Sequence, residues 1–126
     1  MKRVPSFAIL LVLCLCDPVA SKLKSKSCKC PGTGCDQTSC DGPLCPKGGC
    51  NQAGTNNPRC SGGVCKQDDT KSPRCENGGC TQNESMEPTC NGGGCTQANS
   101  MKPTCDGGGC VQSGSMDPSC TGGGCL

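Results

Sequence analysis

The sequence contains no histidine, tryptophan or tyrosine, and its only phenylalanine is Phe7. Without imidazole it cannot form a Ser-His or Cys-His catalytic pair or a histidine-ligated metal centre. With one aromatic residue and 17% charged residues among 126, it also lacks the side chains for a large apolar core. A fixed structure therefore needs covalent links, and the 18 cysteines, together with 20 glycines, are what the chain has in abundance.

Residues 1–20 have the three-part pattern of a secretory signal peptide. Lys2 and Arg3 give a basic start, residues 7–16 form an apolar run, and small residues follow around Ala20. The apolar run is too short to cross a bilayer as a helix, which takes about 20 residues. We therefore predict a signal peptide over 1–20, a secreted, extracellular protein and no transmembrane segment.

The remaining cysteines are even in number once Cys14 and Cys16 leave with the signal peptide. In an oxidising compartment an even, regularly spaced set predicts disulfides, and the four residues between repeated cysteines are more than zinc or iron–sulfur motifs use. We predict no metal and no cofactor. The predicted disulfide cysteines are Cys28, Cys30, Cys35, Cys40, Cys45, Cys50, Cys60, Cys65, Cys75, Cys80, Cys90, Cys95, Cys105, Cys110, Cys120 and Cys125.

From Cys30 onward the sequence repeats with a fixed period. We number positions 1–15 from the first cysteine of each unit, so that full units begin at residues 30, 45, 60, 75, 90 and 105, and a truncated unit begins at 120. Cysteine occupies positions 1 and 6, Gln position 8 and Pro position 14, and glycine is frequent at positions 3 to 5. Such a fixed period indicates an array. The predicted organisation is a signal peptide over 1–20, a basic arm over 21–29 and glycine-rich tandem repeats over 30–126.

Two disulfide patterns fit this spacing. The first joins positions 1 and 6 of each unit through a glycine turn and leaves Cys28 to pair with Cys40. The second joins position 6 to position 1 of the next unit. We predict the first, which is the simplest pairing; the sequence alone leaves the second open.

Two architectures also fit. Ordering one whole unit costs about 20 kcal/mol, whereas the small ring between positions 1 and 6 contributes about 2 kcal/mol. This comparison favours a string of small stapled rings with little regular secondary structure, an expanded radius and no cooperative thermal transition. The alternative is a cystine-lined solenoid in which neighbouring units share hydrogen bonds.

The periodic cysteine resembles that of small secreted Cys-rich repeat proteins, including the stapled coils of some insect ice-binding proteins. Those coils depend on regular rows of threonine, whereas here only Thr81 and Thr96 follow position 6 in register. The resemblance therefore implies no function.

Two modifications are predicted. Asn83-Glu84-Ser85 is a glycosylation sequon, which predicts a glycoprotein. Glutamine is mostly an exposed residue type, and one at the same position of every unit is a candidate for transglutaminase cross-linking, the alternative being that it caps a turn or faces water. The candidates are Gln37, Gln52, Gln67, Gln82, Gln97 and Gln112.

The arm over 21–29 is basic through Lys22, Lys24, Lys26 and Lys29. It is either a solvated terminus or a contact for heparin-like glycans or anionic membrane. In the repeats we expect no basic face, and with no aromatic platform we predict no nucleic-acid binding.

These features predict a secreted, non-enzymatic structural, coating or multivalent interaction protein, with cross-linking into a matrix or secretion as one way of acting. Its partners are expected among extracellular proteins or glycans. Carboxylates such as Asp68 and Asp69 lack a pocket that would hold them for catalysis. The alternative is a host-defence or inhibitory factor that acts on a membrane or on a protease, since Pro-Arg-Cys at Arg59 and Arg74 is similar to some inhibitor loops.

Overall fold

Each turn of the chain pairs with the turn formed by the next repeat unit. The computed structural model describes residues 28–126, which form a β-solenoid of about five turns with no helix among these residues. No helix in this part of the chain is long and apolar enough to span a membrane. The predicted signal peptide and most of the basic arm lie outside the described residues, and of the arm lysines only Lys29 lies within them.

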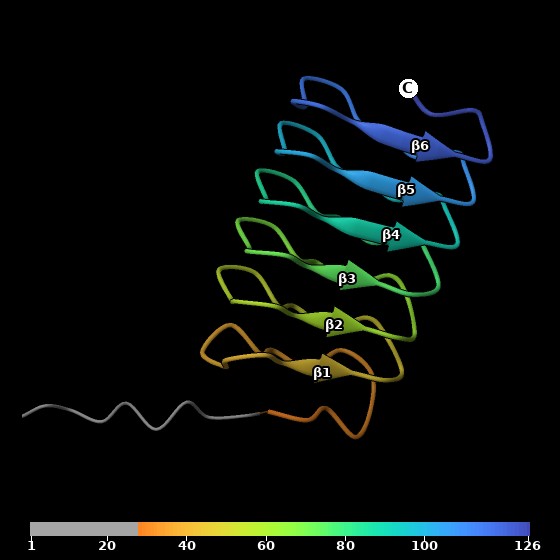
Figure 1. Ribbon diagram of the computed structural model, residues 1–126. Coiled ribbons are helices and arrows are strands. Elements are labelled where there is room, and N and C mark those ends of the chain that lie inside the picture. The colour runs from red at the N-terminus through yellow and green to blue at the C-terminus, as the bar shows by residue number, and fades with distance from the viewer. Residues whose placement is uncertain (1–27) are drawn as a thin grey trace, which may run out of the picture.

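One parallel sheet runs the length of the solenoid, with its six short strands in chain order (Figure 1). The register shift equals one repeat unit throughout, so that Cys45 pairs with Cys60 and Cys60 with Cys75. The strands are β1 (Leu44–Cys45), β2 (Arg59–Cys60), β3 (Arg74–Cys75), β4 (Thr89–Asn91), β5 (Thr104–Asp106) and β6 (Ser119–Thr121). Two further ladders of isolated parallel bridges connect the residues at position 7, such as Thr81 and Thr96, and those at position 12, such as Met86 and Met101.

The structure is a cystine-lined solenoid, as the alternative prediction had it. The prediction of a flexible string of small rings was wrong. The estimate behind the string treated one unit in isolation, where a single small ring cannot offset the cost of ordering. In the solenoid, Thr96 N–H donates to the Cys80 carbonyl at 2.9 Å and Gln97 N–H donates to the Val111 carbonyl at 2.7 Å. Each turn therefore shares hydrogen bonds with both neighbours, which stabilise it together with the staple. The prediction of little regular secondary structure holds for strand length, since no strand among residues 28–126 exceeds three residues.

In the units that begin at residues 45 to 105, glycine at position 4 is required by the close approach of successive turns; the first unit has Thr33 at this position. Gly93 has a φ of 73°, and a Cβ there would lie 2.2 Å from the carbonyl oxygen of Gly108 on the next turn. That same oxygen accepts a hydrogen bond from Gly94 N–H at 3.1 Å. The missing side chain thus lets the two turns come close enough to bond.

The core contains cystine sulfur and glutamine rather than branched apolar side chains. The cysteines at positions 1 and 6 are at most 2% exposed from Cys30 to Cys110, apart from the partly buried Cys35. Gln52, Gln67, Gln82 and Gln97 are fully buried, as are the prolines at position 14 between Pro43 and Pro103.

The buried glutamines form a continuous hydrogen-bonded column. Gln82 Nε2 donates to Gln67 Oε1 at 2.9 Å and to the Thr89 carbonyl at 3.1 Å. Gln97 Nε2 in turn donates to Gln82 Oε1 at 3.0 Å. The pattern runs from Gln37 to Gln112, and each donation from one glutamine to another points toward the N-terminal turn. Because the amides satisfy one another, a polar residue can fill the interior.

Candidate functional site

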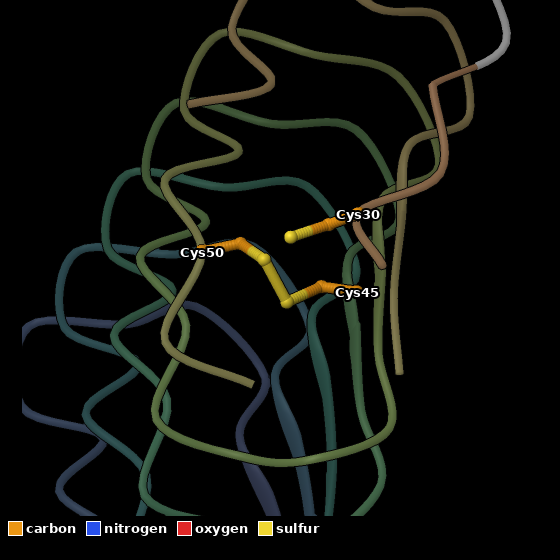
Figure 2. Close-up of side chains that lie close together, drawn as sticks. All are labelled: Cys30, Cys45 and Cys50. Atoms are coloured by element: carbon orange, nitrogen blue, oxygen red, sulfur yellow. A yellow bond between two sulfur atoms is a disulfide. The ribbon is translucent and has the colours of Figure 1, made fainter. Parts of the chain in front are cut away.

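The disulfides follow the first of the two patterns, within units. Cys28 pairs with Cys40 at a Cα separation of 5.7 Å, and the other seven join positions 1 and 6 at 5.9–6.3 Å. Consecutive cystines stack along the solenoid, so that the sulfur of Cys30 lies within 4.8 Å of both sulfurs of the Cys45–Cys50 pair (Figure 2). These sulfur clusters have the spacing of a metal site. Their atoms are bonded as cystines, however, and thiolates are what a soft metal would need.

The candidate cross-linking glutamines are not on the surface. Gln52, Gln67, Gln82 and Gln97 are 0% exposed, Gln37 is 2% and Gln112 is 7% exposed. Cross-linking needs an accessible amide, and here the Nε2 of each glutamine is engaged in hydrogen bonds inside the solenoid. The expectation of accessible glutamines was therefore wrong for the folded protein, because the column satisfies the amides better than isolated turns could.

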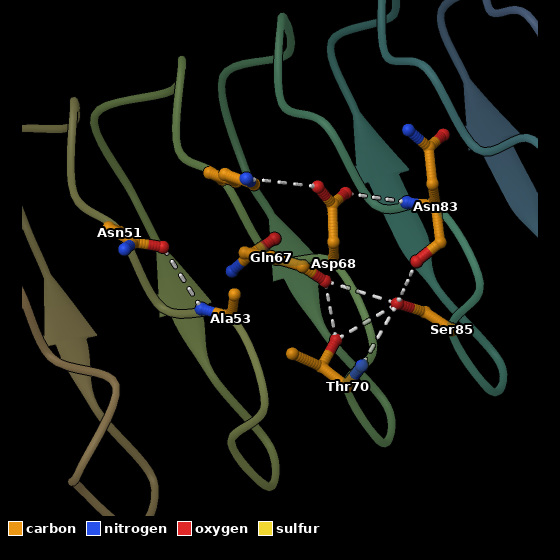
Figure 3. Close-up of polar contacts among 8 residues, drawn as sticks. Asn51, Ala53, Gln67, Asp68, Thr70, Asn83 and Ser85 are labelled. Atoms are coloured by element: carbon orange, nitrogen blue, oxygen red, sulfur yellow. Dashed lines mark hydrogen bonds and ion pairs between the residues drawn. The ribbon is translucent and has the colours of Figure 1, made fainter.

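The predicted sequon contains one residue of a second buried polar column, which is formed by the hydroxyl side chains at position 11, such as Thr70, Ser85 and Ser100. The Ser85 hydroxyl is 1% exposed and contacts the Gln67 carbonyl at 3.1 Å and Thr70 Oγ1 at 3.1 Å (Figure 3). Asn83 is half-buried, and its Oδ1 accepts a hydrogen bond from Ala98 N–H at 3.0 Å. Glycosylation of Asn83 stays a prediction, and it would have to precede folding because the fold buries the hydroxyl of the sequon.

The outer face of the sheet carries two rows of side chains. Cysteine at position 1 points inward, so the residues on either side of it, at positions 15 and 2, face outward. The position 15 row begins with Lys29, which bridges to Leu44, and continues through Arg59, Arg74, Thr89 and Thr104.

Three shallow hollows lie along this row. The first contains Lys29, Leu44 and Arg59, the second Asn57, Arg59, Ser72 and Arg74, and the third Ser72, Arg74, Glu87, Thr89, Lys102 and Thr104. Adjacent hollows share residues: Arg59 borders the first two, and Ser72 and Arg74 border the last two. We call the three together the groove. Along the solenoid axis, the first hollow lies among residues at positions 15, 1 and 2, and the second and third lie between residues at positions 13 and 15.

Positive charge gathers in the groove. Residues 28–126 contain seven lysines and arginines, of which four (Lys29, Arg59, Arg74 and Lys102) border it. The same residues contain nine aspartates and glutamates, of which only Glu87 borders the groove. The expectation of no basic face in the repeats was therefore wrong. Arg59 and Arg74 occupy position 15 of consecutive units, so the solenoid places them side by side on neighbouring strands.

One acid next to the groove is held in its ionised form. Glu76 Oε1 accepts from Arg59 at 2.6 Å, and Oε2 accepts from the Ser61 hydroxyl at 2.6 Å. The hydrogen bond from Ser61 and then that from Arg59 lower the pKa of Glu76 below its ordinary value of 4.5, while partial burial acts in the opposite direction. The pair fixes the position of the Arg59 side chain on the outer face of the sheet.

Replacing Glu76 by glutamine should change the acid stability of the protein slightly. Since its pKa is lowered in the folded state, Glu76 stabilises the fold above the unfolded-state pKa, and this contribution is lost as the pH falls through the folded-state pKa. For an exposed pair we expect a difference below about 1 kcal/mol, seen as a shallower loss of stability between pH 5 and pH 3 in denaturant titrations. Glu84→Gln, an exposed carboxylate of the same unit, is the control. Parallel curves for Glu76→Gln and the wild-type protein would contradict the assignment.

Parallel strands in a register of one repeat unit, cystines stacked inside and a groove outside define a disulfide-rich β-solenoid. A model of the family "Secreted RxLR effector protein RXLR-C08 C-terminal domain" matches residues 22–85, 37–102 and 69–126. The first two matches start one repeat apart, at residues 22 and 37, and together the three cover most of the chain. The chain belongs to this family, and the protein is secreted. No curated protein and no solved structure matched it.

Proposed function

We propose that this chain is a non-catalytic secreted effector that acts by binding an extended partner along the groove. The observation that carries the proposal is the line of three hollows that share bordering residues over the turns from Lys29 to Thr104. A groove parallel to the solenoid axis offers the same contact repeatedly, once per turn. Contacts that are weak singly gain affinity when they are linked in this way.

The stapled core supports binding by a rigid surface. An ordered binding face avoids the entropy loss that a flexible chain pays on association. The Cα atoms of the groove residues are held by backbone bonds, such as that from Arg74 N–H to the Pro58 carbonyl at 2.9 Å. The multivalent interaction role predicted from the repeat is therefore retained, and the matrix role that depended on accessible glutamines is not.

Binding is better supported than catalysis. Asp68, one of the predicted carboxylates, accepts from the backbone N–H of Asn83 at 2.9 Å and lies 3.9 Å from Lys66 Nζ, so it contributes to the stacking of turns (Figure 3). Glu76 has a lowered pKa, the opposite of what a general acid needs. Protease inhibition is less well supported than groove binding, because Arg59 and Arg74 lie in strands of a sheet and not on a projecting loop.

The proposal is tested by filling the groove without changing its charge. Thr89→Trp and Thr104→Trp place a bulky side chain in the third hollow, whereas Thr81→Trp and Thr96→Trp place it on the position 7 row. All four threonines are half-buried, so the two sets are matched. On an array of polysaccharides and extended peptides, we expect the groove variants to lose the ligands that the wild-type protein retains. Equal losses of binding in both sets of variants, or no loss in either set, would rule out the groove as the binding face.

A further inference from the structure

We infer that the partner of the groove is an acidic polysaccharide, an inference that rests on the proposed function and specifies its ligand. The first step is the geometry of the cations. Lys29, Arg59 and Arg74 occupy position 15 of their turns, and each turn adds about 4.8 Å along the axis. Arg59 and Arg74 are thus about 5 Å apart and Lys29 about 10 Å from Arg59. Lys102 occupies position 13 of its unit and borders the third hollow.

The second step is that these cations have unused binding capacity. Arg74 forms no salt bridge within residues 28–126, and Arg59 contacts Glu76 through Nη2. The side chains of Lys29, Arg59, Arg74 and Lys102 are all exposed. Arginine presents a planar set of donors that suits carboxylate and sulfate oxygens. An anionic ligand lying along the axis would therefore contact several cations at once.

The third step is that the groove offers sugar hydroxyls their partners. Between the cations lie the Asn57 amide and the hydroxyls of Ser72, Thr89 and Thr104. These groups both donate and accept hydrogen bonds. Their lining is polar throughout the second and third hollows, which suits a hydroxylated chain better than an apolar one.

Two other polyanions fit the groove less well. An acidic peptide binds strongly when it adds a strand to a free sheet edge. Along the groove the strand backbone is already paired, as in the bonds from Arg59 N–H to the Pro43 carbonyl and from Thr89 N–H to the Pro73 carbonyl, both 2.9 Å. A nucleic acid single strand is bound by stacking its bases on aromatic side chains, and residues 28–126 contain none. An acidic polysaccharide requires neither feature.

The test uses two defined probes, polygalacturonate for carboxylate groups and heparin for sulfate groups, with neutral dextran as the control polymer. The full secreted chain is immobilised and binding is measured at about 50 and about 200 mM NaCl. We expect binding to at least one acidic probe, none to dextran, and a tenfold or greater loss of affinity at the higher salt. The probe that binds more tightly identifies the acidic group.

Arg59→Gln/Arg74→Gln should weaken binding at least tenfold, while Lys47→Gln/Lys66→Gln, which removes two cations outside the groove, should change it less than twofold. Equal effects of the two double variants, or dextran binding as strong as that of the acidic probes, would overturn the inference. An acidic peptide or oligonucleotide bound more tightly than either polysaccharide would also overturn it.

If Thr89→Trp abolishes array binding while Arg59→Gln/Arg74→Gln does not, the groove remains the binding face and only the acidic ligand is wrong. Circular dichroism of each variant, compared with the wild-type spectrum, separates loss of binding from loss of folding.

Discussion

Gln82→Glu is expected to destabilise the protein by about 3–5 kcal/mol at pH 7 and far less at pH 4. The carboxylate would replace a fully buried amide whose Nε2 donates to Gln67 Oε1 and to the Thr89 carbonyl. Ionised, it offers neither bond and faces two oxygens. Protonated, it restores one donor and still accepts from Gln97. A buried acid of this kind has a raised pKa in the folded state, so stability is lost as the pH rises above the unfolded-state pKa.

Guanidinium titrations at pH 4 and pH 7, with the disulfides intact, measure this effect. Thr81→Glu introduces the same charge one residue away on the outside of the solenoid and is the matched control. Gln82→Met keeps the volume, removes both donors and should cost about 2–4 kcal/mol at either pH, because it leaves buried oxygens without partners. Destabilisation by Gln82→Glu that does not depend on pH would show that the amide is not part of a buried column.

Gly93→Ala should destabilise the solenoid by more than about 3 kcal/mol, whereas Gly94→Ala should cost only about 1 kcal/mol. Both glycines have left-handed backbone, with φ of 73° and 68°. They differ in what an added Cβ would meet: the Gly108 carbonyl oxygen at 2.2 Å for Gly93, and nothing closer than 4.0 Å for Gly94. The comparison therefore separates backbone strain from steric exclusion by the next turn.

The measurement is the free energy of unfolding of both variants from denaturant titration. Position 5 already accepts a side chain in this protein, because Val64 occupies it with a φ of 57° and is 71% exposed. Equal destabilisation by the two alanines would mean that the turns are farther apart than the structure places them. Since turns contact only their neighbours, a weak turn at Gly93 should also let the two ends of the solenoid unfold separately.

The disulfide pairing could be predicted from the sequence, whereas the hydrogen bonds between successive turns could not. The fixed period and the glycines between positions 1 and 6 indicate small rings, because only a sharp reversal brings such close cysteines together. The role of Gln82 was missed for a physical reason. Polarity predicts exposure for a single residue, whereas a row of identical amides satisfies its own donors and acceptors once the turns are stacked. The repeat of Gln at position 8 was visible, and the signal for burial was its invariance beside variable neighbours.

The groove was missed for a related reason. Arg59 and Arg74 belong to two Pro-Arg-Cys segments in consecutive units, and each segment by itself is similar to some inhibitor loops. Equivalent residues lie about 5 Å apart if the units stack and much farther apart if they do not. The comparison of ordering cost with ring stabilisation favours units that do not stack. In the stacked units the same two residues are paired on neighbouring strands, and both border the hollow that Ser72 lines.

The closure of the seven disulfides between positions 1 and 6 within their own units also bears on how such a chain can change its length. Among residues 28–126 no cystine crosses from one turn to a later one, and beyond the Cys28–Cys40 pair each ring spans only positions 1 to 6. Inserting or deleting one whole unit by unequal recombination would leave every remaining cysteine of the repeats with its partner. Each added unit would extend the glutamine column by one amide and the groove by about 4.8 Å. Tandem duplication can therefore adjust the number of contacts with a long ligand in discrete steps, with no intermediate that carries an unpaired thiol.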